Sequence, residues 1–193
     1  MMRAVVIGAL ILGASSARGA TVEGSASIDG EPAAHTVVYL EGADPPLAAA
    51  PAERVIMDQK YLAFAPHVLP VLRGTVVEFT NSDEVQHNVF SPSAPVGKFN
   101  LGTYGPGATR AVTLDRPGDV LVLCNIHMEM EAHVVVLDGP YFTTTAKDGS
   151  YRIPDVPAGT YLLKIWKRGW LTPSRTVDLP ATGTIRIDIA AGK

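Results

Sequence analysis

The stretch VLVLCNIHMEMEAHVVVL, residues 120–137, places two strand-like runs on either side of a short polar loop. Residues 120–124 and 133–137 are rich in valine and leucine, and β-branched runs of this length favour strands. The loop between them contains His127, Met128 and Met130, and Cys124 ends the first run. This stretch therefore predicts two neighbouring strands whose connection gathers sulfur and imidazole side chains at one end of a sheet.

Strand signals recur along the chain, and helix signals do not. Residues 36–40 (TVVYL) and 74–80 (GTVVEFT) are further β-branched or aromatic runs, and residues 184–189 (TIRIDI) alternate isoleucine with charged side chains. After the first twenty residues, no run of about 12 keeps the apolar spacing of a helix without a glycine or a proline. We expect an all-β fold built from β-sandwiches.

The composition excludes several classes of protein. The 193 residues include 18 glycines and 15 prolines, too many turn formers for a helical bundle, and 47% hydrophobic residues, too many for a disordered chain. A net charge of −3 offers no basic surface, so we expect no nucleic-acid partner. The single cysteine excludes an internal disulfide, a dithiol pair and a cysteine-rich zinc site. Hydrolase and phosphate-binding motifs are absent from the sequence, and we do not expect an enzyme.

Residues 1–20 have the layout of a secretory signal peptide. Arg3 precedes an apolar core over residues 4–14, and the small residues that follow leave three cleavage points open, after Ala17, Gly19 or Ala20. The apolar core has about 11 residues, short of the roughly 20 that span a bilayer. We therefore expect an exported protein without a membrane span, located in the periplasm if the source is a Gram-negative bacterium.

A candidate metal site combines the loop after Cys124 with a histidine from an earlier strand. His87 follows the run at 74–80 and a turn, and Cys124, His127 and Met130 come 37, 40 and 43 positions later. One thiolate, two imidazoles and one thioether are the ligand set of a blue-copper centre, in which methionine is the weak axial ligand. Three groups on one short loop and a fourth on a neighbouring loop can converge on a single ion at the end of a sandwich.

Each of these residues has a plainer interpretation when it is taken alone. A lone cysteine at a strand end is usually buried packing, a lone histidine near a turn usually lies on the surface, and methionines fill cores. The four together, in an exported all-β chain, favour the copper site. We expect Met128 at the surface rim, and structural or exposed roles for the other three histidines, His35, His67 and His133.

Residues 53–138 resemble a cupredoxin of the plastocyanin and amicyanin type. The resemblance rests on FAP at 64–66, VLRGTVVEFTN at 71–81, HNV at 87–89 and the CxxHxxM spacing at 124–130. It implies a Greek-key β-sandwich that holds one type 1 copper ion, with three strong ligands and one axial ligand: His87, Cys124 and His127, and Met130.

The same resemblance implies roles for residues near the ligands. In the family, the positions of Asn88 and Asn125 help to tie the two ligand loops together by hydrogen bonds. This chain has Ala132 where the family usually has glycine, and we expect that difference to alter packing after the loop without affecting ligation.

The C-terminal part is similar to the carboxypeptidase regulatory-like (transthyretin-like) β-sandwich. The similarity rests on TAKDGSYRIPDVPAGTY at 145–161, with turn signals at DG and PAG. A strand pair typical of the start of that family occurs at 21–42 (TVEGSASIDGEPAAHTVVYLEG). We expect Trp166 and Trp170 to cap a sandwich core rather than to form a docking or sugar-binding patch.

The two similarities together predict a split domain. We expect a signal peptide at 1–20, the first strand pair of the transthyretin-like domain at 21–42, a linker at 43–52, the cupredoxin domain at 53–138 and the remainder of the transthyretin-like domain at 139–193. In the alternative arrangement, residues 21–42 add edge strands to the cupredoxin.

The function implied by these similarities is one-electron transport by an exported type 1 (blue) copper protein. By resemblance, the solvent-facing edge of His127 is the electron port within an apolar rim, and the partner is a redox protein, a periplasmic dehydrogenase or a cytochrome. The alternatives are a copper-binding or sensing module without redox turnover, and a cell-envelope interaction protein.

Overall fold

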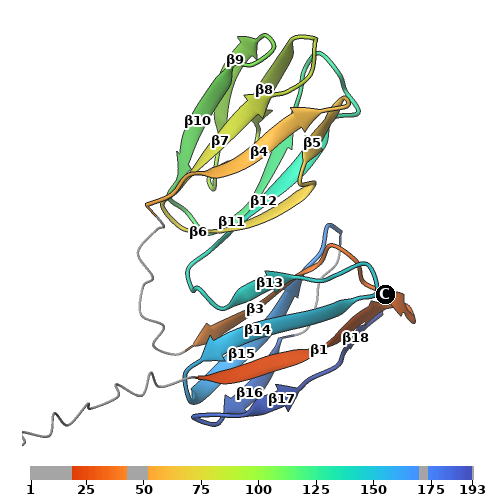
Figure 1. Ribbon diagram of the computed structural model, residues 1–193, viewed down its shortest axis with the longest axis vertical. Coiled ribbons are helices and arrows are strands. Elements are labelled where there is room, and N and C mark those ends of the chain that lie inside the picture. The colour runs from red at the N-terminus through yellow and green to blue at the C-terminus, as the bar shows by residue number, and fades with distance from the viewer. Residues whose placement is uncertain (1–18, 43–51, 170–173, 193) are drawn as a thin grey trace, which may run out of the picture.

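The computed structural model describes residues 19–42, 52–169 and 174–192, and these residues form strands and turns without a helix (Figure 1). The expectation of an all-β fold is confirmed. The strands belong to two sandwiches, one formed by the middle of the chain and the other by its two flanks. No helix of the described residues is long and apolar enough to cross a membrane.

The middle sandwich consists of two sheets that enclose one apolar core. One sheet has the order β10-β7-β4-β5 and the other β6-β12-β11-β8-β9. Alternate side chains of β7 are buried, so Val77 and Phe79 enter the core together with Val89, Val122 and Val134 of the facing sheet. The strands are β4 (Val55–Lys60), β5 (Ala63–Ala65), β6 (Val68–Leu72), β7 (Thr75–Asn81), β8 (His87–Ser91), β9 (Phe99–Tyr104), β10 (Thr109–Leu114), β11 (Gly118–Leu123) and β12 (Glu131–Leu137).

The second sandwich pairs strands from both flanks of the chain. In one sheet β1 lies between β14 and β17, and also pairs with β18 and β2; in the other sheet the order is β13-β3-β15-β16. The core between them includes Val22, Leu40, Ile153 and Leu163. The strands are β1 (Ala20–Ile28), β2 (Glu31–Pro32), β3 (Val37–Gly42), β13 (Phe142–Thr144), β14 (Ser150–Val156), β15 (Gly159–Trp166), β16 (Arg175–Leu179), β17 (Thr184–Arg186) and β18 (Ile189–Ala191).

The pairing of β3 bears on the split-domain hypothesis. Val37 to Gly42 pair with β15 along the whole strand, and Val37 to Tyr39 also pair with β13. Within the described residues, the strand partners of β1 and β3 therefore all come from the flanks, and the domain boundaries themselves stay a prediction. The linker expected at 43–52 and the signal peptide expected at 1–20 lie almost wholly outside the described residues, although β1 already begins at Ala20.

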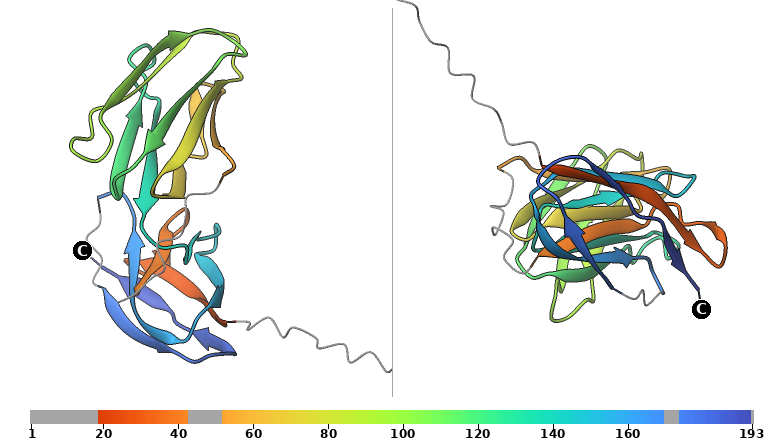
Figure 2. Two further views of the ribbon diagram at one scale, coloured as in Figure 1. Left: turned by 90° about the vertical axis from the view of Figure 1, so that its left-hand side faces the viewer. Right: turned by 90° about the horizontal axis from the view of Figure 1, so that it is seen from below.

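Strand β12 lies in contact with both sandwiches. Its even-numbered residues Ala132, Val134 and Val136 pack into the middle core, whereas Val135 and Leu137 pack against Val37 of the second sandwich. Because β12 is buried on both faces, its sequence is an almost unbroken apolar run rather than an alternation of apolar and polar residues. Figure 2 shows the two sandwiches stacked along the long axis of the molecule.

Two expectations differ from the structure. Residues 184–189 form β17 and the first residue of β18 instead of one strand, and between these strands the carboxylate of Asp188 accepts hydrogen bonds from the Ser25 amide (2.8 Å) and hydroxyl (2.9 Å) in place of ladder bonds to β1. The alternation of the sequence is kept, because Ile187 is buried while Arg186 and Asp188 are exposed. Trp166 is partly buried in the apolar cluster between the two sandwiches rather than in the core of one. Trp170 lies outside the described residues.

Candidate metal centre

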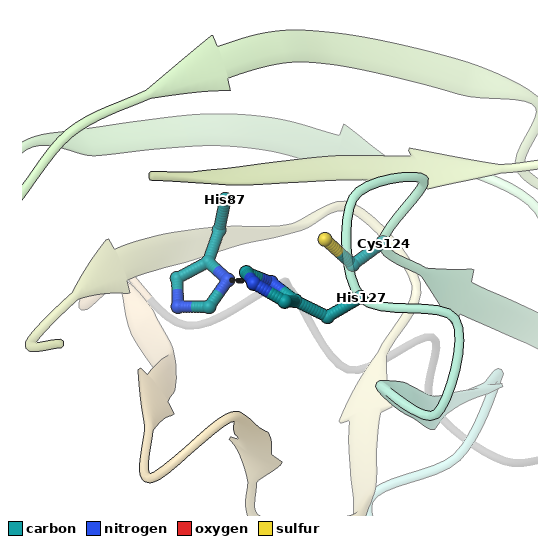
Figure 3. A group of neighbouring side chains, drawn as sticks. All are labelled: His87, Cys124 and His127. Atoms are coloured by element: carbon teal, nitrogen blue, oxygen red, sulfur yellow. Dashed lines mark hydrogen bonds between the residues drawn. The ribbon is translucent and has the colours of Figure 1, made fainter. Parts of the chain in front are cut away.

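Three of the four predicted ligands meet at the end of the middle sandwich. His87 opens β8, Cys124 directly follows β11, and His127 lies in the loop that leads to β12 (Figure 3). One ligand atom from each residue lies within 4.8 Å of the other two. Within the described part of the chain, this is the single group of three histidine, cysteine or acidic residues that meets this criterion.

The two imidazoles are spaced as a shared ion requires. The distance between the Nδ1 atoms of His87 and His127 is 3.1 Å, and the ring centres lie 4.9 Å apart with the planes 65° to one another. Two nitrogens that each bind an ion at about 2.0 Å and lie this far apart subtend an angle of roughly 100° at the ion. Such an angle suits a trigonal or tetrahedral centre, so the geometry fits a bound metal.

His87 is held in one orientation by a carboxylate. The side chain of His87 is fully buried, and its Nε2 lies 2.9 Å from Oδ2 of Asp83. A carboxylate only accepts, so Nε2–H is the donor, and the Nδ1 lone pair of His87 faces the Nδ1 of His127, with which it shares a hydrogen bond of 3.1 Å. Histidines that bind metals commonly donate their second ring nitrogen to a carboxylate in this way.

Asp83 is itself fixed as an anion. Its two oxygens accept the backbone amides of Tyr61 (2.6 Å) and Leu62 (3.0 Å) in the turn between β4 and β5. Burial acts to raise the pKa of Asp83, but the hydrogen bonds from Leu62, His87 and Tyr61 outweigh it and lower the pKa below its usual value. The carboxylate therefore stays charged at neutral pH and continues to accept the proton of His87.

The turn before His87 is built around Asn81. Its Oδ1 accepts the Asp83 amide at 3.0 Å, and its Nδ2 donates to the carbonyl of Val85 at 2.8 Å. Asn81 is fully buried, so this short loop is anchored from the inside. The sequence SDEV that follows Asn81 thus places Asp83 beneath His87.

Cys124 is a buried thiol within reach of one backbone donor. Only 4% of the residue is exposed, and the amide of Asn88 points to its Sγ at 3.5 Å. Hydrogen bonding to the cysteine sulfur is one of the features that set the potential of a copper–thiolate centre. This contact ties the two ligand loops together through the backbone of Asn88. The Asn88 side chain bonds to Asn100 instead, and Asn125 is exposed.

The methionines of the loop differ sharply in exposure. Met130 is 1% exposed and packs in the middle core, whereas Met128 is 89% exposed. The backbone of Met130 closes the loop, because its amide donates to the carbonyl of His127 (3.0 Å) and its carbonyl accepts the amide of Cys124 (3.3 Å). Met130 is therefore buried and bonded through its backbone to Cys124 and His127, and its role as axial ligand stays a prediction.

The remaining histidines lie away from this site. His35 and His67 are exposed, and His133 is buried in β12 with its Nδ1 2.8 Å from the carboxylate of Asp119. Ala132, where the resembling family has glycine, is fully buried in the middle core.

Sequence reasoning missed Asp83 and the turn at Tyr61 and Leu62. An acidic residue four positions before a ligand histidine was the available signal, but in a polar turn it is indistinguishable from a solvated side chain. The amides that hold Asp83 come from residues about twenty positions earlier, and both of those residues have positive φ values of 58° and 57°. Only the folded chain brings them together.

Exposed apolar side chains surround the candidate centre. Ile126 and Met128 flank His127, Val85 lies two residues before His87, and the Tyr61–Leu62 turn covers Asp83; all are at least 43% exposed. Of the six large hydrophobic residues exposed in the described chain, these five share one end of the molecule. We call them the apolar rim.

The fold and the site thus define an all-β chain of two sandwiches with a histidine–cysteine–histidine group at the end of one. Residues 130–192 match the family model of the carboxypeptidase regulatory-like domain. The match begins at Met130 and so includes β12, which is a strand of the middle sandwich, and it leaves out β1 and β3. Comparison of the sequence with curated proteins gives no match.

The structural neighbours of the chain are cupredoxins that align with about half of it. A purple cupredoxin from Nitrosopumilus maritimus is 21% identical and aligns over 43% of this chain and 99% of its own, with a TM-score of 0.39. The Cu(I) form of a methionine-to-alanine mutant of amicyanin is also 21% identical, over 52% of this chain and 98% of its own, with a TM-score of 0.41. A copper-containing nitrite reductase from Thermus scotoductus SA-01 is 23% identical over 50% of this chain, with a TM-score of 0.43, and only 25% of the nitrite reductase is covered.

Proposed function

We propose that this protein is a mononuclear blue-copper electron carrier, with His87, Cys124, His127 and Met130 as the ligands of one type 1 copper ion. The observation that carries the proposal is the buried group in which two Nδ1 atoms 3.1 Å apart and one thiol sulfur lie within 4.8 Å of one another. Imidazole and thiolate together are the donors that accommodate both Cu(II) and Cu(I).

The protein residues supply a rigid frame for the centre. Asp83 holds the His87 ring, the Asn88 amide faces the thiol, and the Met130 backbone closes the loop. When bound, copper supplies a one-electron couple between Cu(I) and Cu(II). Because the ligands are held by strands and by the hydrogen bonds around them, the site changes little in shape between the two states, and electron exchange stays fast.

The apolar rim is the docking surface in this proposal. Exposed hydrophobic side chains gathered at one end of a folded domain mark an interaction site. His127 is partly buried and stands in the chain between the exposed Ile126 and Met128, so a partner that covers the rim approaches the metal through this imidazole. The partner is a redox protein, a periplasmic dehydrogenase or a cytochrome, and the chain itself performs no catalysis.

The location follows from the N-terminal sequence. The signal-peptide pattern of residues 1–20 supports export to the periplasm. Strand β1 begins at Ala20, which is fully buried and pairs with Val156, so cleavage that keeps Ala20 keeps the sheet intact.

The rate of electron exchange distinguishes an electron carrier from a copper-binding or sensing module. The copper-loaded protein is mixed with a reduced c-type cytochrome in a stopped-flow instrument, and we expect rapid oxidation of the cytochrome. Met128→Glu, which puts a charge on the apolar rim, should slow the exchange while the copper spectrum is unchanged. A copper-loaded protein that exchanges electrons only over many minutes would instead indicate a copper-binding or sensing module without redox turnover.

A further inference from the structure

The backbone donor that faces the Cys124 sulfur lies in a strand that is only partly held by its neighbours. This donor is the amide of Asn88, 3.5 Å from Sγ, and Asn88 directly follows the ligand His87 in β8. On one side, β8 pairs with β11 at a single position, Phe90 with Leu123. On the other side it pairs with β9, the edge strand of the sheet. The position of the Asn88 amide therefore depends on how β8 is held against β9.

The pairing of β8 with β9 is irregular next to Asn88. Asn88 pairs with Thr103, but two residues later Phe90 pairs with Asn100, so one residue of β8 stands opposite two residues of β9. Gly102, inside this bulge, has a φ of 76°, a left-handed value that favours glycine. A bulge interrupts the ladder of backbone hydrogen bonds between two strands. Other bonds must therefore fix β8 at this point.

The side chain of Asn100 spans the bulge. Its Oδ1 accepts the Gly102 amide at 2.9 Å and the Nδ2 of Asn88 at 3.1 Å. The Gly102 amide can only donate, so the atom of Asn100 that it meets is the carbonyl oxygen, and the atom of Asn88 that faces the same oxygen is the NH₂ group. A single oxygen thus joins the bulge of β9 to the side chain of Asn88.

Asn100 is the one hydrogen-bond partner of the Asn88 side chain among the described residues. Asn88 is 2% exposed, and its Oδ1 is buried without a partner. The bond from its Nδ2 to Asn100 therefore fixes the orientation of this side chain. Because the side chain and the amide belong to the same residue, this bond also restricts how far the amide can turn away from Cys124.

We propose that Asn100 is a positioning residue for the copper centre, which holds Asn88 so that the Asn88 amide donates to the Cys124 thiolate and raises the reduction potential. The inference rests on the proposed blue-copper function. Hydrogen bonding to the cysteine sulfur is one of the features that set the potential of such a centre. An N–H group that donates to the sulfur withdraws electron density from it, which disfavours Cu(II) more than Cu(I). Loss of the tether should therefore lower the potential.

Hydrogen exchange in the metal-free protein tests the tether without copper. Asn100→Ala removes the acceptor of Asn88 and should speed exchange of the Asn88 amide about fivefold, as expected for the loss of one hydrogen bond. Asn100→Asp keeps an acceptor oxygen for both donors and should keep the slow exchange. Thr103→Ala is the matched control, because Thr103 is exposed on the same strand and pairs with Asn88; its exchange rate should equal that of the wild type.

The midpoint potential of the copper-loaded protein tests the consequence. Asn100→Ala should lower the potential while the thiolate-to-copper charge-transfer band is kept, since Asn100 is exposed and is not a ligand. Thr103→Ala should leave the potential unchanged. When Asn100→Ala is combined with Asn88→Ala, the potential should move no further than in Asn88→Ala alone, because the tether is already lost.

Three outcomes would overturn the inference. The first is an Asn88 amide that exchanges at the wild-type rate in Asn100→Ala, and the second is an unchanged potential in that variant. The third is a further shift when Asn100→Ala is added to Asn88→Ala, which would mean that Asn100 acts by another route. A colourless wild-type protein would instead contradict the proposed function itself, and the exchange rates of the metal-free protein would still decide whether Asn100 holds the Asn88 amide.

Discussion

Replacing Asp83 by asparagine should weaken copper binding without unfolding the protein. Asparagine keeps a single acceptor oxygen and no charge, so in either orientation its NH₂ group meets a donor: the Tyr61 amide at the Oδ1 position, or the Leu62 amide and the Nε2–H of His87 at the Oδ2 position. The variant therefore loses the charge-assisted bond that orients the buried ring. Loss of such a partner typically lowers metal affinity about 10- to 100-fold, or roughly 1.4 to 2.8 kcal/mol.

The assay is a competition between the protein and a Cu(I) chelator of known affinity. Glu84→Gln is the matched control, because it removes one negative charge from the adjacent exposed position and does not touch His87. We expect Asp83→Asn to bind copper at least tenfold more weakly and Glu84→Gln to bind within about twofold of the wild type. If Asp83→Asn also binds within twofold, the carboxylate does not position His87 and the reasoning is refuted.

Three further substitutions test the site and the second sandwich. Met130→Leu should keep copper and raise the reduction potential, because a donor to Cu(II) is lost. Met128→Leu, a change at an exposed methionine, should leave the potential unchanged. Equal potentials for the wild type and both variants would remove Met130 from the ligand set. Gly24→Ala should destabilise the fold by about 1–3 kcal/mol or more in urea unfolding, because its Cβ would lie 1.9 Å from a backbone carbonyl oxygen. Gly105→Ala is the control, since the Cβ at that position meets open space. Similar urea midpoints for the two variants would contradict the close approach at Gly24. Hydrogen bonds from the hydroxyl and amide of Ser25 lower the pKa of Asp188, so its carboxylate stabilises the fold above the usual pKa of 3.8 and loses this effect as the pH falls through the lowered pKa. The difference in melting temperature between the wild type and Asp188→Asn should therefore disappear in acid. A difference that persists in acid would refute this prediction.

The sequence was sufficient for the parts of the site that are local. Cys124, His127 and Met130 share one seven-residue loop, and the apolar runs on both sides predict its two strands. His87 was found because its strand and turn resemble those of a known family. The structure then brings His87, Cys124 and His127 within ligand distance of one another.

Long-range contacts account for what the sequence did not reveal. Asp83 orients His87 only because the Tyr61–Leu62 turn supplies two amides from another strand pair. Within the run at 184–189, Asp188 bonds to Ser25, a residue 163 positions away, in place of ladder bonds to β1. No local pattern carries either contact.

The two-sided burial of β12 is a further long-range effect. Its unbroken apolar sequence predicts a strand, but it does not say that Val135 and Leu137 meet Val37 of the second sandwich. This contact also brings Trp166 against His133. The junction therefore became visible only in the assembled structure.

The central claim is that Cys124 binds copper together with His87 and His127. The most direct measurement is the visible absorption spectrum of the purified protein as Cu(II) is added. We predict an intense thiolate-to-copper charge-transfer band that saturates at one equivalent and is absent in Cys124→Ser. A wild-type protein that remains colourless at saturation, or a Cys124→Ser variant that develops the same band, would contradict the claim.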